Sequence, residues 1–172
     1  MSGQSWTGAL AQALANKGKP PVRVALVGVG NELNGDDAAG GEVIRRLSRC
    51  LQPSGNLLLL DAGSSPENFS GPLRRLQPDW LIFIDAAWMD EPPGTIRWVE
   101  MDEVDGVSAV THGLPVTMLA GYLMAETDCR VGLIAIQPAS LEFESKLTPA
   151  VGQAVDEVIE GLFRLFSGCD SG

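Results

Sequence analysis

A valine-rich apolar run near the start of the chain limits the folds that this sequence can adopt. Residues 22–29 are apolar at almost every position. Such a run is typical of a strand covered on both faces, as in a parallel sheet flanked by helices. Short apolar runs recur at 57–60, 80–84 and 130–136, and a looser one occurs at 95–100. We therefore expect a sheet made mostly of buried strands, with the looser run as a candidate edge strand.

The segments between these runs carry helical patterns. We expect helices from Asp36 or Asp37 to about residue 51, and at 66–76, 115–126 and 149–166. Acidic residues favour a helix start, and we assign Asp36 as the cap of the first helix. Strands that alternate with helices form a mostly parallel sheet with right-handed crossovers. The predicted fold class is α/β, with helices on both faces of the sheet.

The length of 172 residues suits a single domain with a sizeable core. We assign residues 22–166 to this domain and residues 167–172 to a polar tail. Residues 1–21 form an N-terminal extension, in which residues 5–16 have the pattern of a short amphipathic helix. We expect this helix to dock on the domain or on a neighbouring molecule, with a frayed terminus as the alternative.

Composition excludes several classes of protein. The net charge of −10 argues against a general nucleic-acid surface, which needs a basic face. No apolar stretch approaches the roughly 20 residues that span a bilayer, so we expect no membrane insertion. The cysteines are widely spaced, at Cys50, Cys129 and Cys169, as in a reduced cytoplasmic protein.

Several chemically active side chains are expected at one edge of the sheet. The 28–37 loop, Asp61 and Asp85 all follow the carboxyl ends of predicted strands, where ligands of such sheets bind. Asp37, Asp85 and the sole histidine, His112, would suit a divalent metal such as zinc or nickel and leave coordination positions open. Three of these residues also have an ordinary structural reading: Asp37 as a helix-start residue, Asp61 as an Asx turn, and His112 as a hydrogen-bonded loop histidine. Asp85 follows four apolar residues, where a carboxylate is costly to desolvate unless it is paired or bound to a cation.

Common nucleotide and hydrolase motifs are incomplete. Gly28 and Gly30 follow the first strand, but Leu33 replaces the third glycine of a dinucleotide fingerprint. Asp36 follows Gly35 where a phosphate-binding loop needs lysine. No serine lies in a Gly-x-Ser-x-Gly elbow, so a Ser-His-Asp hydrolase has no visible nucleophile.

Taken together, the motifs resemble those of the maturation endopeptidases of [NiFe]-hydrogenases. The segments that carry the resemblance, in chain order, are Gly28-Val-Gly-Asn31, Leu33, Asp36-Asp37, Asp61-Ala-Gly63, Asp85-Ala86 and Thr111-His112-Gly-Leu-Pro115. The 63–68 and 136–138 segments resemble the subgroup that serves formate-hydrogenlyase-type and related energy-converting hydrogenases. The resemblance covers residues 22–166 and implies a twisted five-stranded sheet between helices.

The resemblance also implies an activity and a site. The family removes a C-terminal extension from the hydrogenase large-subunit precursor after nickel insertion. Its metal-contacting and catalytic set corresponds here to Asp37, Asp85 and His112, with the nickel contributed transiently by the substrate and another divalent metal as a substitute in vitro. Asp61 corresponds to a position associated with substrate recognition or cleavage, and we assign Gly63 and Asn31 to substrate recognition with it.

The sequence leaves the protease class and two alternative functions open. The protease class is either aspartic-like or metal-assisted, and many relatives have glutamate, one methylene longer, where this chain has Asp37. A non-catalytic module that checks the precursor for nickel would use the same three residues. A small-ligand protein of phosphorylase-like architecture is a further alternative, although its crevice would lack a basic phosphate-binding residue.

Overall fold

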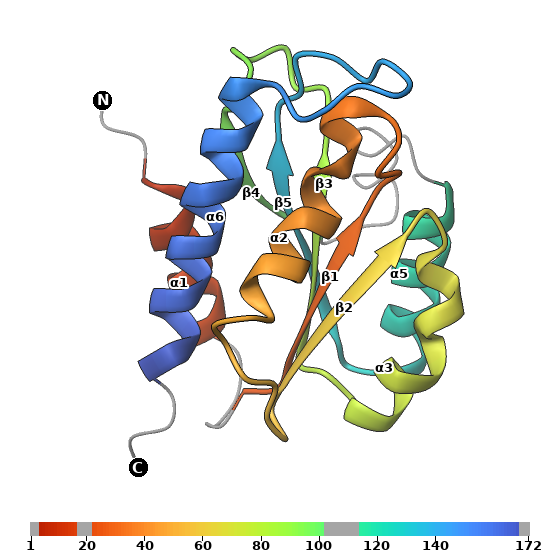
Figure 1. Ribbon diagram of the computed structural model, residues 1–172. Helices are drawn as coiled ribbons and strands as arrows, with labels where there is room; N and C mark the ends of the chain where they lie inside the picture. Colours follow the sequence, from red (N-terminus) through yellow and green to blue (C-terminus); the bar gives the residue numbers. More distant parts are fainter. Residues whose placement is uncertain (1–3, 17–21, 102–113, 169–172) are drawn as a thin grey trace.

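Five strands form one sheet between two layers of helices (Figure 1). The computed structural model describes residues 4–16, 22–101 and 114–168. The strands are β1 (Val24–Val29), β2 (Leu57–Gly63), β3 (Trp80–Ala86), β4 (Ile96–Glu100) and β5 (Arg130–Ile136). Their order across the sheet is β2-β1-β3-β5-β4, with β4 antiparallel to β5 and the other pairs parallel. The expected α/β class and the edge position of the looser strand are confirmed.

The helices cover both faces of this sheet. They are α1 (Trp6–Ala15), α2 (Ala39–Leu47), α3 (Ser70–Leu76), α5 (Leu114–Glu126) and α6 (Pro149–Ser167), with short 3-10 helices η1 (Gly35–Ala38) and η2 (Pro66–Phe69). Helices α1, α2 and α6 lie on one side of the sheet, and α3 and α5 lie on the other (Figure 1). None of the helices in the described residues is long and apolar enough to cross a membrane.

The apolar first strand supplies both halves of the core. Val24 and Leu26 pack with α2 and α6 in one cluster of buried residues. Ala25 and Val27, which point to the opposite face, pack with α3 and α5 in a second cluster. Every residue of β1 is buried, which explains why its sequence shows no polar alternation.

Helix α1 packs against the body of the protein. The hydroxyl of Ser5 caps the helix by accepting a hydrogen bond from the Gly8 N–H at 3.2 Å. The Trp6 Nε1 donates to Glu157 of α6 at 3.2 Å, and Leu10 is fully buried. The amphipathic pattern near the N-terminus therefore forms a helix whose apolar face completes the core beside α6.

The observed elements differ from the expected ones mainly at their ends. Strands β2 and β3 continue through Asp61 and Asp85, so both carboxylates lie within the last residues of strands. The segment after the first loop starts as the 3-10 helix η1, and the α-helix begins only at Ala39. The helical start at Asp36 or Asp37 was thus wrong for the α-helix.

Two glycines bring α2 unusually close to the sheet. A Cβ atom at Gly28 of β1 would lie 2.3 Å from the Gly40 carbonyl oxygen of α2. A Cβ atom at Gly40 would lie 2.1 Å from the Ile84 carbonyl oxygen and 2.5 Å from that of Val29. Only hydrogen fits at these positions, so the glycines set the height of α2 above β1 and β3.

Substitution of Gly40 tests this close approach. Gly40→Ala forces a methyl group onto backbone atoms that cannot rotate away, and we expect a loss of about 3 kcal/mol in the free energy of unfolding. The matched control is Gly152→Ala in α6, where nothing lies within 4 Å of the new methyl group, and a gain of up to about 1 kcal/mol is expected. Urea unfolding of both variants measures the difference. Equal midpoints would contradict the account.

Candidate functional site

The loop after β1 folds back tightly on itself at the carboxyl edge of the sheet. Gly30 has a φ of +131°, and a Cβ atom there would lie 1.9 Å from the Asp37 carbonyl oxygen. The Gly30 N–H donates to the Gly63 carbonyl at the end of β2 at 2.9 Å. Glycine is therefore needed at position 30 so that the Asp37 backbone can pack against the end of β1, and not so that a phosphate can bind there.

Hydrogen bonds within this loop position Asp37. Its Oδ2 accepts from the Asn31 N–H at 2.8 Å, and the Asn31 Oδ1 accepts from the Leu33 N–H at 2.9 Å. Asp37 is half-buried within η1, two residues before α2 begins at Ala39. Its carboxylate is thus oriented by the loop, and Asn31 is one of the residues that orient it.

Asp85 is a buried carboxyl group with an unsatisfied oxygen. Its side chain is 7% exposed, and its Oδ1 has no hydrogen-bond partner among the described residues. Burial raises the pKa of Asp85 well above its ordinary value, and the negative charge of Asp37 raises it further, while the Ala86 N–H lowers it. The fold therefore brings Asp37 and Asp85 together with no described positive charge to compensate them.

The third member of the predicted set, His112, lies outside the described residues. Among the described residues, no group of three or more His, Cys, Asp or Glu side chains is placed to hold a metal ion. The structure thus places two of the three predicted donors on adjacent parts of one edge, and the triad as a whole stays a prediction.

Asp36 has a different role from the helix cap that we assigned. It is fully buried, and its carboxylate accepts hydrogen bonds from the N–H groups of Ala139, Ser140 and Thr148 at 2.7–3.1 Å. The Thr148 hydroxyl donates to the same carboxylate. Asp36 therefore ties the first loop to the 137–148 loop and to the start of α6.

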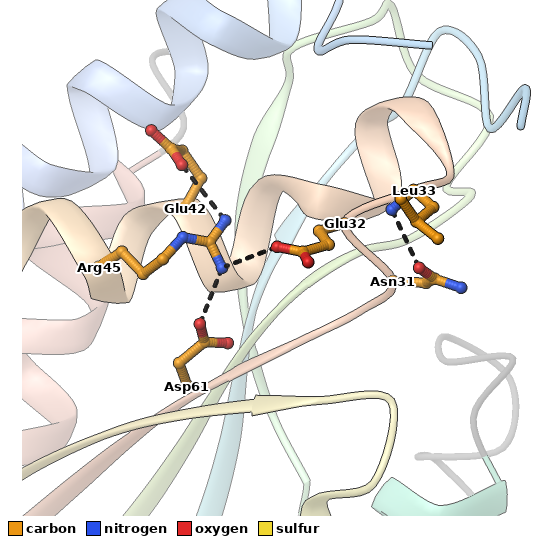
Figure 2. Close-up of polar contacts among 6 residues, drawn as sticks. All are labelled: Asn31, Glu32, Leu33, Glu42, Arg45 and Asp61. Atoms are coloured by element: carbon orange, nitrogen blue, oxygen red, sulfur yellow. Dashed lines mark hydrogen bonds and ion pairs between the residues drawn. The ribbon is translucent and has the colours of Figure 1, made fainter. Parts of the chain in front are cut away.

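Asp61 is paired with an arginine instead of forming an Asx turn. The Arg45 guanidinium of α2 donates to Asp61 at 2.8 Å and to Glu42 at 3.3 Å, and lies 3.9 Å from Glu32 (Figure 2). Partial burial works against this charge, but the bonds to Asp61 and Glu42 raise the pKa of Arg45 above its ordinary value. Gly41 leaves this contact uncrowded, because a Cβ atom there would lie 2.9 Å from both Arg45 and Asp61 side-chain atoms.

A polar cleft of about 340 Å³ opens over this ion pair. Its lining residues come from the loop after β1, from the end of β2 and from α2, and they include Asn31, Arg45, Asp61 and Gly63. All three predicted substrate-recognition residues thus line one cleft. Sequence reasoning missed Arg45, for which the Gly40-Gly41 pair was the available signal of a close contact across α2.

The environment of Asp85 predicts an unusual effect on stability. Because its pKa is raised in the folded state, the folded protein holds a proton that the unfolded chain releases, and stability falls as pH rises from about 4 to the raised pKa. Asp85→Asn removes this penalty. We expect it to match the wild type near pH 3 and to exceed its unfolding free energy by more than about 1 kcal/mol at pH 8.

Urea unfolding across this pH range checks the prediction. The control Asp156→Asn removes a surface carboxylate that pairs with Arg46 at 2.6 Å, and it should lose less than about 1 kcal/mol at pH 8. An Asp85→Asn protein that is less stable than the wild type at pH 8 would show that the Asp85 charge is already compensated.

Sequence and structure comparisons agree on one family. The family model described as hydrogenase maturation protease matches residues 41–164. A hydrogenase 3 maturation protease of Escherichia coli (strain K12) is 33% identical over 138 residues, which cover 80% of this chain and 86% of that protein.

Solved structures show the same likeness in three dimensions. The [NiFe] hydrogenase maturation protease HycI from Thermococcus kodakarensis KOD1 aligns with a TM-score of 0.81 and 26% identity, over 92% of this chain and 99% of that chain. The endopeptidase HycI from Escherichia coli aligns with a TM-score of 0.70 and 30% identity, over 83% and 92% of the two chains. The chain belongs to the hydrogenase maturation protease family.

Proposed function

We propose that this protein removes the C-terminal extension of a [NiFe]-hydrogenase large-subunit precursor once nickel has been inserted. The observation that carries the proposal is the pair formed by Asp37 and Asp85, in which a buried carboxyl oxygen has no described partner. A buried carboxylate needs a proton or a cation. Nickel that arrives with the substrate would supply the cation only when a loaded precursor is bound.

In this proposal the protein's residues recognise nickel that the precursor's own cysteines still hold. Asp37 and Asp85 would each offer a carboxylate oxygen, and His112 a neutral imidazole nitrogen, a donor set that suits nickel. Asp37 is already oriented by the Asn31 N–H, so little reorganisation is needed at this position. Nickel is thus the part of the substrate that these residues would recognise by binding it.

Recognition of the metal would bring the scissile peptide to the same edge of the sheet. The cleft that Asp61 and Arg45 line begins beside Gly30 and Asn31, in the loop that orients Asp37. A carboxylate of the pair can take a proton from a water molecule that attacks the peptide carbonyl, and the leaving amine then receives a proton. Under the metal-assisted alternative, the substrate's nickel also polarises the carbonyl.

The substrate subgroup and the cellular location belong to the same proposal. The resemblance of the 63–68 and 136–138 segments supports a formate-hydrogenlyase-type or related energy-converting hydrogenase. The widely spaced cysteines, typical of a reducing compartment, support a cytoplasmic site of action. A module that only checks for nickel would share the Asp37, Asp85 and His112 set, and the experiment below separates it from the protease.

The test compares nickel-loaded and nickel-free precursor from the same source, with intact mass as the readout. We expect the wild type to release one C-terminal peptide from the loaded form only. Asp37→Ala and His112→Ala should each slow this release by at least about 100-fold, because each removes a donor to the metal. Asp37→Glu is the matched control, since it keeps the carboxylate and should retain most of the activity.

Three results would overturn parts of the proposal. Equal cleavage of both precursor forms would remove the nickel requirement. Unchanged cleavage by His112→Ala would remove His112 from the site. Binding of the loaded precursor without any cleavage would favour the checking module over the protease.

A further inference from the structure

Three large apolar side chains are exposed beside the site. Leu33 is 52% exposed, Leu141 is 36% exposed and Phe143 is 64% exposed. Leu33 belongs to the loop that carries Asp37, and the other two belong to the 137–148 loop that Asp36 holds. We call these three residues the rim patch. Figure 1 shows the two loops in contact at the carboxyl end of the sheet.

The rim patch is held rigidly. The Glu144 N–H donates to the Leu33 carbonyl at 2.7 Å, and the Asp36 N–H donates to the Ser140 carbonyl at 3.0 Å. The buried Asp36 carboxylate adds bonds to the Ala139 and Ser140 N–H groups. These bonds fix the backbone of the two loops that carry the exposed side chains, which lowers the entropic cost of binding a partner there.

The backbone beside Phe143 is also strained. Glu144 has a φ of +59°, in the left-handed region that residues other than glycine rarely adopt. Its N–H bond to the Leu33 carbonyl keeps it there. The strained conformation of Glu144 constrains the backbone next to Phe143. Strain of this kind is often found at ligand-binding and active sites.

The rim patch is continuous with the cleft over Asp61. A second cleft, of about 450 Å³, is lined by Leu33, Ser145 and Leu147. It shares Glu32, Ala38 and Arg45 with the first cleft, so the two clefts adjoin at these residues, and we call them together the groove. A protein whose peptide chain enters this groove beside Leu33 would lie against the rim patch.

The charges around the patch indicate the chemistry of its partner. Glu142 and Glu144 are exposed beside the three apolar residues, and so is Lys146. Glu32 is exposed as well, and its carboxylate lies 3.9 Å from the Arg45 guanidinium. An apolar centre with an acidic border complements a surface that has an apolar side chain bordered by Lys or Arg.

We propose that the rim patch docks the folded body of the precursor through an apolar side chain flanked by basic residues. This inference rests on the proposed function and adds a second point of contact, outside the nickel site. The patch sets affinity for the whole precursor, whereas Asp37 and Asp85 act at the bond that is cleaved. Substitutions in the patch should therefore raise KM and leave kcat unchanged.

The experiment uses the full chain and the nickel-loaded large-subunit precursor. We expect Phe143→Ala to raise KM for processing and Kd for the precursor by roughly tenfold, with kcat within about twofold of the wild type. Phe163→Ala is the matched control, because Phe163 is also an exposed phenylalanine, at 39%, but lies on α6 among Arg46, Cys50 and Asp156. A second variant, Glu142→Lys, should slow association most strongly at low salt.

The outcomes separate this inference from the proposed function. Cleavage by the wild type with equal KM for Phe143→Ala and Phe163→Ala would overturn the docking surface and leave the protease intact. A fall in kcat for Phe143→Ala at unchanged KM would likewise overturn it, in favour of a role at the reacting bond. Neither binding nor cleavage by the wild type would overturn both.

Discussion

The close approach of α2 to the sheet at Gly28 and Gly40 is the constraint on which the rest of the site depends. Because no side chain separates these backbones, the start of α2 lies directly over the ends of β1 and β3. Asp37, just before α2, is thereby brought close enough to Asp85 for its charge to raise the pKa of that carboxyl. The adjacent Gly41 leaves room for Arg45 to reach Asp61. The position of α2 relative to the sheet thus determines both the Asp37–Asp85 pair and the cleft beside Asp61.

Asp36 and Asp37 are adjacent in the sequence, but their carboxylates lie in opposite electrostatic environments. Asp36 is buried and satisfied by several donors from the 137–148 loop, so its charge stabilises the fold. Asp37 lies close enough to Asp85 for its negative charge to raise the pKa of that carboxyl, and like charges destabilise one another. The Asp36 carboxylate holds the two loops together by hydrogen bonds. The Asp37 carboxylate adds negative charge beside Asp85. The like charges of Asp37 and Asp85 lower the stability of the fold, as is common at a site that binds a cation.

The sequence predicts the fold well because the three central strands, β1, β3 and β5, are buried almost throughout, and because α2 and α6 are amphipathic. The apolar runs locate all five strands, and the carboxyl-edge rule brings Asp37, Asp61 and Asp85 to one edge. The pattern could not distinguish Asp36 from a helix cap, since its partners lie more than 100 residues away. Arg45 was missed for a similar reason: its contact with Asp61 depends on the height of α2, which only the glycine pair signals.

The central claim is that the Asp85 charge lacks compensation until a nickel-bearing substrate binds. Carbon-13 NMR of the labelled Asp85 carboxyl measures this directly, with the free protein compared to its complexes with nickel-loaded and nickel-free precursor. The account predicts a raised pKa in the free protein and in the nickel-free complex, and a fall in that pKa only in the loaded complex. An Asp85 pKa that is ordinary in the free protein, or that does not respond to the loaded precursor, would contradict it.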